Sequence, residues 1–248
     1  MLTPTNRFPI KFDGMRHTSR RILRALRGRD FWQREQMQCE KFSAGCEHAC
    51  WCIAPDLLKP DSVIYSFGVG EEISFDLELI RRFGVTVHAF DPTPRSVQWL
   101  ARQQLPQDFI FHDYGVAAID GTCSFHPPQQ TTYISHTIIP KSNLRPPIQV
   151  PMLRLTSIMS RLGHDRIDLL KMDIEGAEYE VISDMLVSGI TVSQLLVEFH
   201  HRWREIGTAR TTAAIQSLNH AGYKIFNISS SGDEYSFRHE LPCALHAQ

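Results

Sequence analysis

The stretch from Asp61 to Glu72, D-S-V-I-Y-S-F-G-V-G-E-E, constrains the fold of this chain more than any other. Its β-branched and aromatic residues, Val63 to Tyr65, predict a buried strand. Gly68 and Gly70 then mark a sharp turn, where the backbone can approach a ligand closely. Apolar residues at helical spacing follow from Ile73 to Arg82 and predict a helix. The stretch therefore predicts a strand, a glycine turn and a helix in immediate succession.

A second predicted strand, Val85 to Phe90, ends at Asp91, which lies 21 residues after Gly70. A carboxylate at roughly this distance from a glycine turn, about 20 residues, commonly binds the hydroxyls of a ribose. The whole unit therefore predicts a site for a nucleoside cofactor, and a purely structural turn is the alternative.

The residues after the turn favour one cofactor over another. A dinucleotide fingerprint would need glycine where Ile73 stands. Glu71 and Glu72 occupy the helix N-terminus where a pyrophosphate would bind, and their carboxylates would repel phosphate but not a cation. S-adenosyl-L-methionine has no phosphate and carries a sulfonium and an ammonium, so we expect it rather than NAD. A simple interaction of the two acids with the helix dipole is compatible with the same pattern.

The bulk properties limit the organisation of the chain and its partners. The chain has 248 residues and a formal net charge of −1, which favours neither nucleic acid nor a charged membrane as a partner. The sequence has no apolar run of about 20 residues and no apolar signal core, so we expect a cytoplasmic protein without a transmembrane segment. We expect an extension over residues 1–57, basic and then cysteine-rich, and one α/β domain over 58–248. A homo-oligomer is compatible with the sequence.

Four of the six cysteines lie in this extension: Cys39, Cys46, Cys50 and Cys52. Together with His48 they could bind zinc, but their spacing matches no standard zinc motif, so we predict no metal there. Free thiols or a local disulfide are the alternatives. Phe31, Trp32 and Trp51 are expected to anchor the extension to the core or to cover a pocket.

A short third strand is predicted over Phe109 to His112, followed by Asp113 and Gly115 in a position where an adenine ring could bind. Residues 116–125 then predict a hairpin around an Asp-Gly turn. The next stretch, 127–151, contains six prolines. Since loops of this length are usually functional or disordered, we interpret it as a substrate or cofactor flap that carries His136.

A second informative stretch begins with a predicted central strand, Ile167 to Met172. Lys171 and Asp173 alternate onto one face at its carboxyl end. Burial of charges is costly unless they are paired or used, and ligands of open α/β sheets bind beyond the carboxyl ends of the strands. We therefore expect Asp173 in the site and Glu175 at the substrate, with an ion pair between Asp173 and Lys171 as the structural alternative.

The next predicted strand, Gln194 to Phe199, also delivers polar side chains to this edge. Glu198 and His200 share a face, and a histidine there can act as a general base near neutral pH. His201 is a further substrate candidate. Acids and histidine from both strands could converge on a metal, but no spacing requires one, and we predict none. A last helix over 208–219 and two strands over 223–228 and 234–238 are expected to close the sheet as an antiparallel pair.

These motifs resemble those of the FkbM family of S-adenosylmethionine-dependent methyltransferases, and in particular its methyltransferase-like 24 branch. The resemblance covers roughly residues 58 to 240. It rests on five strings: Y-S-F-G-V-G from Tyr65, F-D-P-T-P from Phe90, S-H-T from Ser135, D-L-L-K-M-D-I-E-G-A-E from Asp168 and V-E-F-H from Val197.

The resemblance implies a class I methyltransferase fold, a Rossmann-like α/β architecture with a mostly parallel seven-stranded sheet, one antiparallel strand and helices on both faces. It implies O-methylation of a sugar or a small natural product. Gly68 and Gly70 would approach the cofactor, Asp91 would bind the ribose, and Asp173 would lie beside the transferred methyl. The family's usual acid at the start of the glycine motif is Ser66 here, so one contact to the cofactor's amino group weakens.

Glu71 is the candidate to replace that missing acid. The expected chemistry is in-line transfer of the sulfonium methyl to a hydroxyl, which mainly requires alignment, with Asp173, Glu198 or His200 handling the proton. Two alternatives stay open. An N-methyltransferase would lack its usual Asn/Asp-Pro-Pro-aromatic motif, because Ile-Glu-Gly follows Asp173. A non-catalytic cofactor-binding protein of the same fold is favoured slightly by Ser66.

Overall fold

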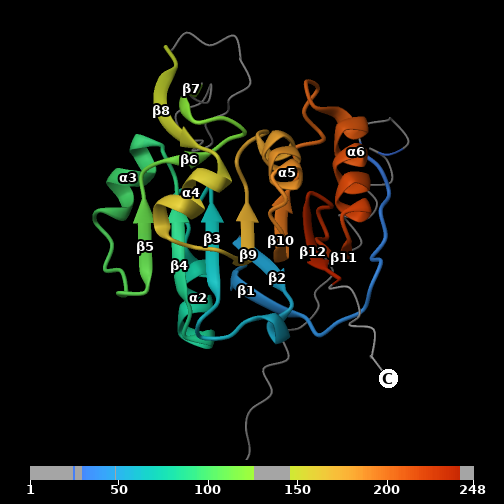
Figure 1. The fold of residues 1–248 in the computed structure, drawn as a ribbon, viewed down its shortest axis with the longest axis horizontal. Coiled ribbons are helices and arrows are strands. Elements are labelled where there is room, and N and C mark those ends of the chain that lie inside the picture. The colour runs from blue at the N-terminus through green and yellow to red at the C-terminus, as the bar shows by residue number, and fades with distance from the viewer. Residues whose placement is uncertain (1–24, 26–29, 48, 126–145, 241–248) are drawn as a thin grey trace, which may run out of the picture.

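The computed structural model of the chain describes residues 25, 30–47, 49–125 and 146–240. Helices and strands alternate around one central sheet (Figure 1). Within these residues no helix combines the length and apolar character needed to span a bilayer. The strands are β1 Phe42–Cys46, β2 Ala49–Ile53, β3 Val63–Phe67, β4 Thr86–Phe90, β5 Phe109–His112, β6 Gly115–Val116, β7 Gly121–Phe125, β8 Ile148–Leu153, β9 Ile167–Met172, β10 Val192–Glu198, β11 Tyr223–Ile228 and β12 Glu234–His239. The helices are η1 Pro55–Leu57, α2 Ser74–Phe83, α3 Pro94–Leu100, α4 Leu155–Leu162, α5 Glu178–Val187 and α6 Gly207–His220.

The central sheet has seven strands in the order β11-β12-β10-β9-β3-β4-β5. β5, β4, β3, β9 and β10 run parallel, and β12 alone is antiparallel to its neighbours β10 and β11. The predicted fold is therefore confirmed, including its one antiparallel strand and the closing pair at the sheet edge. The chain order reverses at the adjacent strands β3 and β9, and ligands of open α/β sheets bind at the carboxyl ends of strands at such a point.

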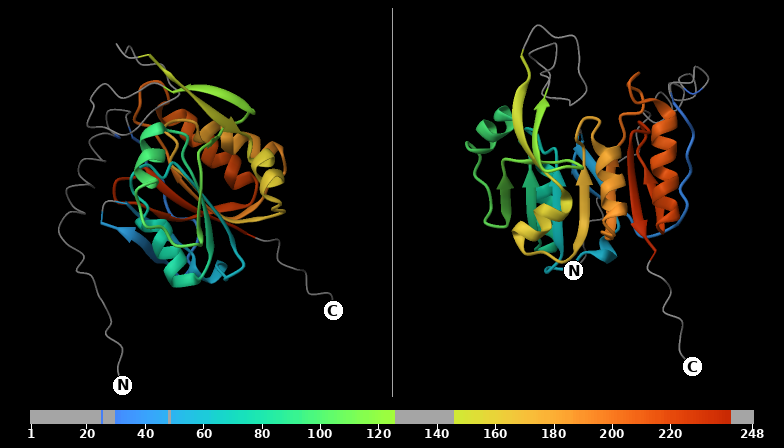
Figure 2. Two further views of the ribbon diagram at one scale, coloured as in Figure 1. Left: turned by 90° about the vertical axis from the view of Figure 1, so that its left-hand side faces the viewer. Right: turned by 45° about the horizontal axis from the view of Figure 1, so that its top comes forward.

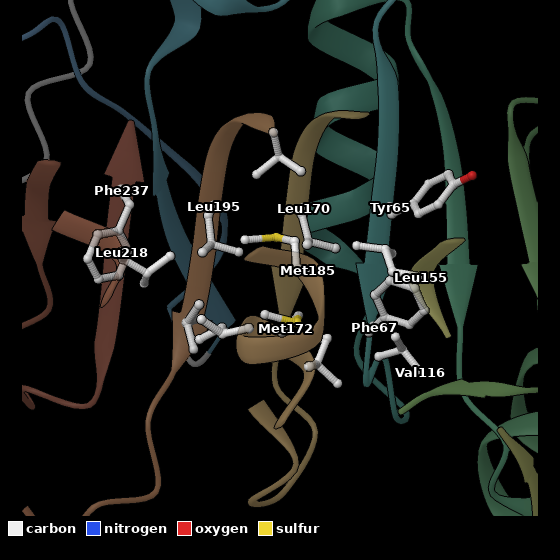
Figure 3. Packing of buried hydrophobic residues seen from close by; sticks show 14 of the residues in the cluster. Tyr65, Phe67, Val116, Leu155, Leu170, Met172, Met185, Leu195, Leu218 and Phe237 are labelled. Atoms are coloured by element: carbon white, nitrogen blue, oxygen red, sulfur yellow. The ribbon is translucent and has the colours of Figure 1, made fainter. Parts of the chain in front are cut away.

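Helices cover both faces of this sheet, as Figure 2 shows. α4, α5 and α6 lie on one face, where the largest apolar cluster packs Tyr65, Leu170 and Leu195 against Met185 and Leu218 (Figure 3). α2, α3 and the β1–β2 hairpin lie on the other face. The central strands are buried on both sides, which explains their continuous apolar sequences.

The predicted hairpin over residues 116–125 is wrong. β6 and β7 do not pair with each other, because β8 lies between them, parallel to β6 and antiparallel to β7. Asp120 accepts hydrogen bonds from the backbone N–H of Arg154 and the hydroxyl of Ser157, at 2.6 and 2.7 Å. β8, which is distant in the sequence, thus provides the hydrogen-bonded partner strand that a local hairpin was expected to provide.

The described part of the N-terminal extension, from residue 30 on, packs on the sheet. Asp30 forms a 2.8 Å ion pair with Arg202, and Phe31 contacts the ring of His201 edge-on. Trp51 is buried, whereas Trp32 is 58% exposed. Cys39, Cys46, Cys50, Cys52 and Cys123 are free thiols, while His48 and Cys243 lie outside the described residues.

A cluster of three histidines lies beneath the carboxyl edge. His88 of β4 and His112 of β5 stack, with their nitrogens 3.1 Å apart, and His164 accepts or donates a 2.7 Å hydrogen bond with the Tyr65 hydroxyl. Burial lowers the pKa of all three rings, and it lowers that of His88 to about 4. The folded protein therefore holds these rings neutral at pH 7.

We expect this cluster to make the fold sensitive to acid. Between pH 6.5 and pH 4 the His88 ring binds more protons in the unfolded chain than in the folded one, so its contribution to stability falls as the pH falls. His88 alone should cost about 2 kcal/mol between pH 7 and pH 5. Urea titrations across this range should show a shallower pH dependence for His88→Gln than for the wild type. The exposed control His220→Gln should retain the wild-type slope, and an unchanged slope in His88→Gln would contradict the prediction.

Candidate functional site

A cavity of about 390 Å³ opens at the carboxyl ends of β3, β4 and β9, the upper edge of the sheet in Figure 1. This volume lies within the range of small-molecule sites, roughly 300–1,000 Å³. Loops after the three strands form its floor, and residues of β2, β6, β7, β8, β10 and β12 complete its walls. The predicted site residues that line it are Gly68, Gly70, Glu71, Asp91, Gly115, Asp173, Glu175 and Glu198.

The glycine turn brings two loops into contact. Gly68 has φ +77°, and a Cβ built on it would lie 1.7 Å from the backbone oxygen of Asp173. Only glycine permits both this dihedral angle and this approach. Gly70, at φ +56°, donates its N–H to Asp91 Oδ2 at 2.9 Å, and Asp91 Oδ1 accepts from the Thr93 hydroxyl at 2.6 Å. The turn thus positions the acid that ends β4.

The two glutamates after the turn have different partners. Glu71 forms a bidentate ion pair with Arg95, with both N–O distances 2.9 Å. Glu72 accepts a 2.7 Å hydrogen bond from the backbone N–H of Ser74, the first residue of α2. The helix N-terminus therefore already holds a carboxylate, which leaves it unsuited to a pyrophosphate. The pairing with Arg95 makes Glu71 a weaker substitute for the acid missing at Ser66.

Asp76, in the first turn of α2, is an acid that the sequence analysis missed. It lines the cavity, is only 2% exposed, and its Oδ1 has no hydrogen-bond partner among the described residues. Burial raises its pKa to about 6, against the opposing effects of the Lys171 charge and the Ser66 hydroxyl. Ser66 itself is fully buried and does not line the cavity. The spatial neighbour of Ser66 thus supplies a carboxylate.

Asp173 and Glu198 lie at the carboxyl ends of the adjacent strands β9 and β10 and form a pair of interacting acids. Burial, together with the Asp173 charge, raises the pKa of Glu198 to about 9. Burial also raises the pKa of Asp173, although the charges of Lys171 and His200 oppose this. The pair therefore holds at least one proton near neutral pH.

His200 lies beside this pair and is 8% exposed. Its Nδ1 is 3.1 Å from Oε1 of the fully buried Glu178, and its Nε2 is 3.5 Å from Glu175 Oε2 and 3.9 Å from Asp173 Oδ1. Burial would lower the pKa of His200, but the nearby carboxylates of Glu178, Glu175 and Asp173 raise it to about 10. These contacts favour the protonated ring, and the general-base role expected from the sequence stays a prediction.

Two other predicted residues lie outside the cavity, and a third cannot be placed among the described residues. Asp113 is exposed and does not line the cavity. His201 points away into a buried ion cluster, where its Nε2 lies 3.2 Å from Asp30 and 3.7 Å from Asp233. His136 lies outside the described residues.

Two further residues of the cavity lie outside the predicted site. Trp51 of the β1–β2 hairpin, which was expected to anchor the extension or to cover a pocket, forms part of its wall, and the Lys171 amine lies 5.1 Å from the centre of that ring. Glu234 of β12 adds another acid, whose pKa is raised by burial. No sequence motif indicated Glu234, because an acid at the start of a strand is not specific to a binding site.

The chain is similar to two curated methyltransferase-like proteins and to a solved structure of an FkbM methyltransferase. The probable methyltransferase-like protein 24 of Homo sapiens and that of Rattus norvegicus are each 29% identical over 143 residues, which cover 56% of this chain and 33% of the relative. The chain thus spans about a third of the length of the curated relatives it matches. The crystal structure of methyltransferase FkbM from Methylobacillus flagellatus matches with a TM-score of 0.46 and 13% identity, covering 73% of this chain and 44% of that one.

The profile of the methyltransferase FkbM domain matches residues 62–225. This range runs from the start of β3 into β11 and includes the glycine turn, Asp91, Asp173 and His200. The match covers more than half of the chain. The chain therefore belongs to the FkbM methyltransferase family.

Proposed function

We propose that this chain is an S-adenosyl-L-methionine-dependent O-methyltransferase acting on a hydroxyl of a sugar or small natural product. The proposal rests on one observation. The glycine turn, Asp91 and Asp173 line the same cavity, at the carboxyl ends of β3, β4 and β9. The nucleoside part of the cofactor would then lie near Asp91 and its reacting methyl group near Asp173, at neighbouring strand ends within one cavity.

The residues of the cavity suit this cofactor. Asp91 offers carboxylate oxygens for ribose hydroxyls, and the close approach of Gly68 to Asp173 leaves backbone exposed beside them. Asp76 offers a buried carboxylate for the ammonium group, in place of the acid that Ser66 lacks. When bound, S-adenosyl-L-methionine supplies an activated methyl on a cationic sulfur. The acids that surround this space favour a cation over a phosphate.

The same acids favour an oxygen acceptor over an amine. A cavity with Asp173, Glu175 and Glu234 would stabilise a bound amine as its ammonium ion, which has no lone pair to accept a methyl group. A hydroxyl keeps its lone pairs and needs only to lose its proton. Glu175 lines the cavity and would receive a hydrogen bond from such an acceptor.

Asp173 is the proposed proton acceptor. Asp173 lines the cavity beside Glu198, and it would accept the proton in its ionised form. The acceptor oxygen forms a bond to the methyl carbon, the carbon–sulfur bond breaks to give S-adenosylhomocysteine, and the hydroxyl proton passes to Asp173. The protein contributes mainly alignment and this proton transfer.

Calorimetry with S-adenosylhomocysteine tests the cofactor part of the proposal. We expect one binding site in the wild type and about a 10- to 100-fold loss of affinity in Asp91→Ala, since two or more charge-assisted hydrogen bonds are removed. The exposed control Asp165→Ala should bind like the wild type. A wild type that binds neither this ligand nor S-adenosyl-L-methionine would overturn the proposed function and favour a non-catalytic protein of the same fold.

A further inference from the structure

We propose that Asp173, Glu175 and His200 form a site for a divalent cation at the floor of the cavity. One ligand atom from each lies within 4.8 Å of the other two. The three come from neighbouring loops, after β9 and after β10, at the same carboxyl edge. Two carboxylates with one imidazole nitrogen form a mixed oxygen and nitrogen set that suits a first-row ion such as Mn²⁺.

The orientation of His200 is the observation that points to a ligand. Its ring is more than nine-tenths buried, with Nδ1 3.1 Å from Glu178 Oε1, and Nε2 points toward the two carboxylates. A carboxylate that fixes the far nitrogen of a histidine is the usual support of a metal-binding imidazole. Glu178 is fully buried and also accepts hydrogen bonds from the backbone N–H groups of Ile174 and Gly176, so it fixes the loop and the ring together.

The distances suit an ion between the three groups better than direct contacts. Nε2 lies 3.5 Å from Glu175 Oε2 and 3.9 Å from Asp173 Oδ1. Both exceed an ordinary N–H···O hydrogen bond of roughly 2.7–3.2 Å. Two ligands of an octahedral ion at about 2.1 Å stand about 3 Å apart when adjacent and about 4.2 Å apart when opposite. The observed separations fall between these limits.

The cation would share the cavity with the acceptor. Asp173 and Glu175 line the cavity, so the open coordination positions of the ion face it. An acceptor hydroxyl bound there would become more acidic and would lie beside Asp173. This role rests on the proposed methyl transfer, whereas binding of the ion itself does not.

Calorimetric titration of the full chain with Mn²⁺ tests the site, and S-adenosylhomocysteine is titrated separately into the same samples. We expect one Mn²⁺ per chain, and about 10-fold or greater losses of Mn²⁺ affinity in Glu175→Gln and His200→Gln. Glu178→Gln, which acts through His200, should weaken Mn²⁺ binding about 10- to 100-fold.

The matched control is Glu72→Gln, which removes one acid from the opposite side of the same cavity. It should bind Mn²⁺ like the wild type. Glu175 lies on a partly exposed loop, so its variant keeps the test valid if His200→Gln fails to fold. A wild type that binds S-adenosylhomocysteine but not Mn²⁺, or equal Mn²⁺ affinities in Glu175→Gln and Glu72→Gln, would overturn the site and leave the proposed function standing.

Discussion

Gly68→Ala is expected to lower the free energy of unfolding by about 3–5 kcal/mol and to abolish binding of S-adenosylhomocysteine. The new methyl would lie 1.7 Å from the Asp173 carbonyl oxygen, which belongs to backbone and cannot rotate away. The left-handed dihedral angle adds about 1–2 kcal/mol to this overpacking. Urea denaturation followed by circular dichroism gives the stability, and calorimetry gives the affinity.

Gly70→Ala separates the effect of the steric contact from the effect of the positive φ angle. Gly70 also has positive φ, but a Cβ there meets nothing within 4 Å. Its substitution should therefore cost only the conformational term, about 1–2 kcal/mol. Equal losses of stability in the two variants would show that the contact between Gly68 and Asp173 does not set the position of the loops.

Asp173→Asn is expected to lower the turnover of methyl transfer by about 10²- to 10⁴-fold, the usual contribution of a positioned general base. The amide keeps the size of the side chain but cannot accept the proton. The contact of Gly68 with the Asp173 backbone does not involve the changed side chain, so the fold should survive. Turnover is measured by release of S-adenosylhomocysteine, with a panel of sugar and small hydroxylated acceptors.

The control for this variant is the exposed Asp165→Asn, which lies before β9 at the opposite end of that strand. It should turn over like the wild type. A turnover of Asp173→Asn within about fivefold of the wild type would remove Asp173 from the role of base. Retained cofactor affinity in that variant would limit the effect to the chemical step.

The central fold could be predicted because its signals are local. The strands around Ile64 and Leu169 are mostly apolar, as is typical of strands buried on both faces. Gly68, Gly84 and Asp91 punctuate them at fixed spacings. The pairing of β6 and β7 could not be predicted, because β8 supplies their partner from about 25 residues farther along the chain.

The candidate site was predictable only in part. Asp91, Asp173 and Glu198 follow strand ends, and the rule that ligands bind beyond carboxyl ends places all three at the cavity. Asp113 obeys the same rule but is exposed. His201 adjoins His200 in the sequence, yet its ring points to Asp30, because successive residues leave the chain in different directions.

The sequence by itself determined the α/β class of the fold, the glycine turn and the acids at the strand ends. Each of these depends on residue type and short spacing. Only the tertiary structure decided which charges face one another. Three examples are the ion pair of Glu71 with Arg95, the burial of the Asp76 carboxylate, and the ion pair of Glu178 with His200. Each depends on how separate elements pack against one another. Such contacts set protonation states and ligand geometry, and they depend on distances in space that no local pattern encodes.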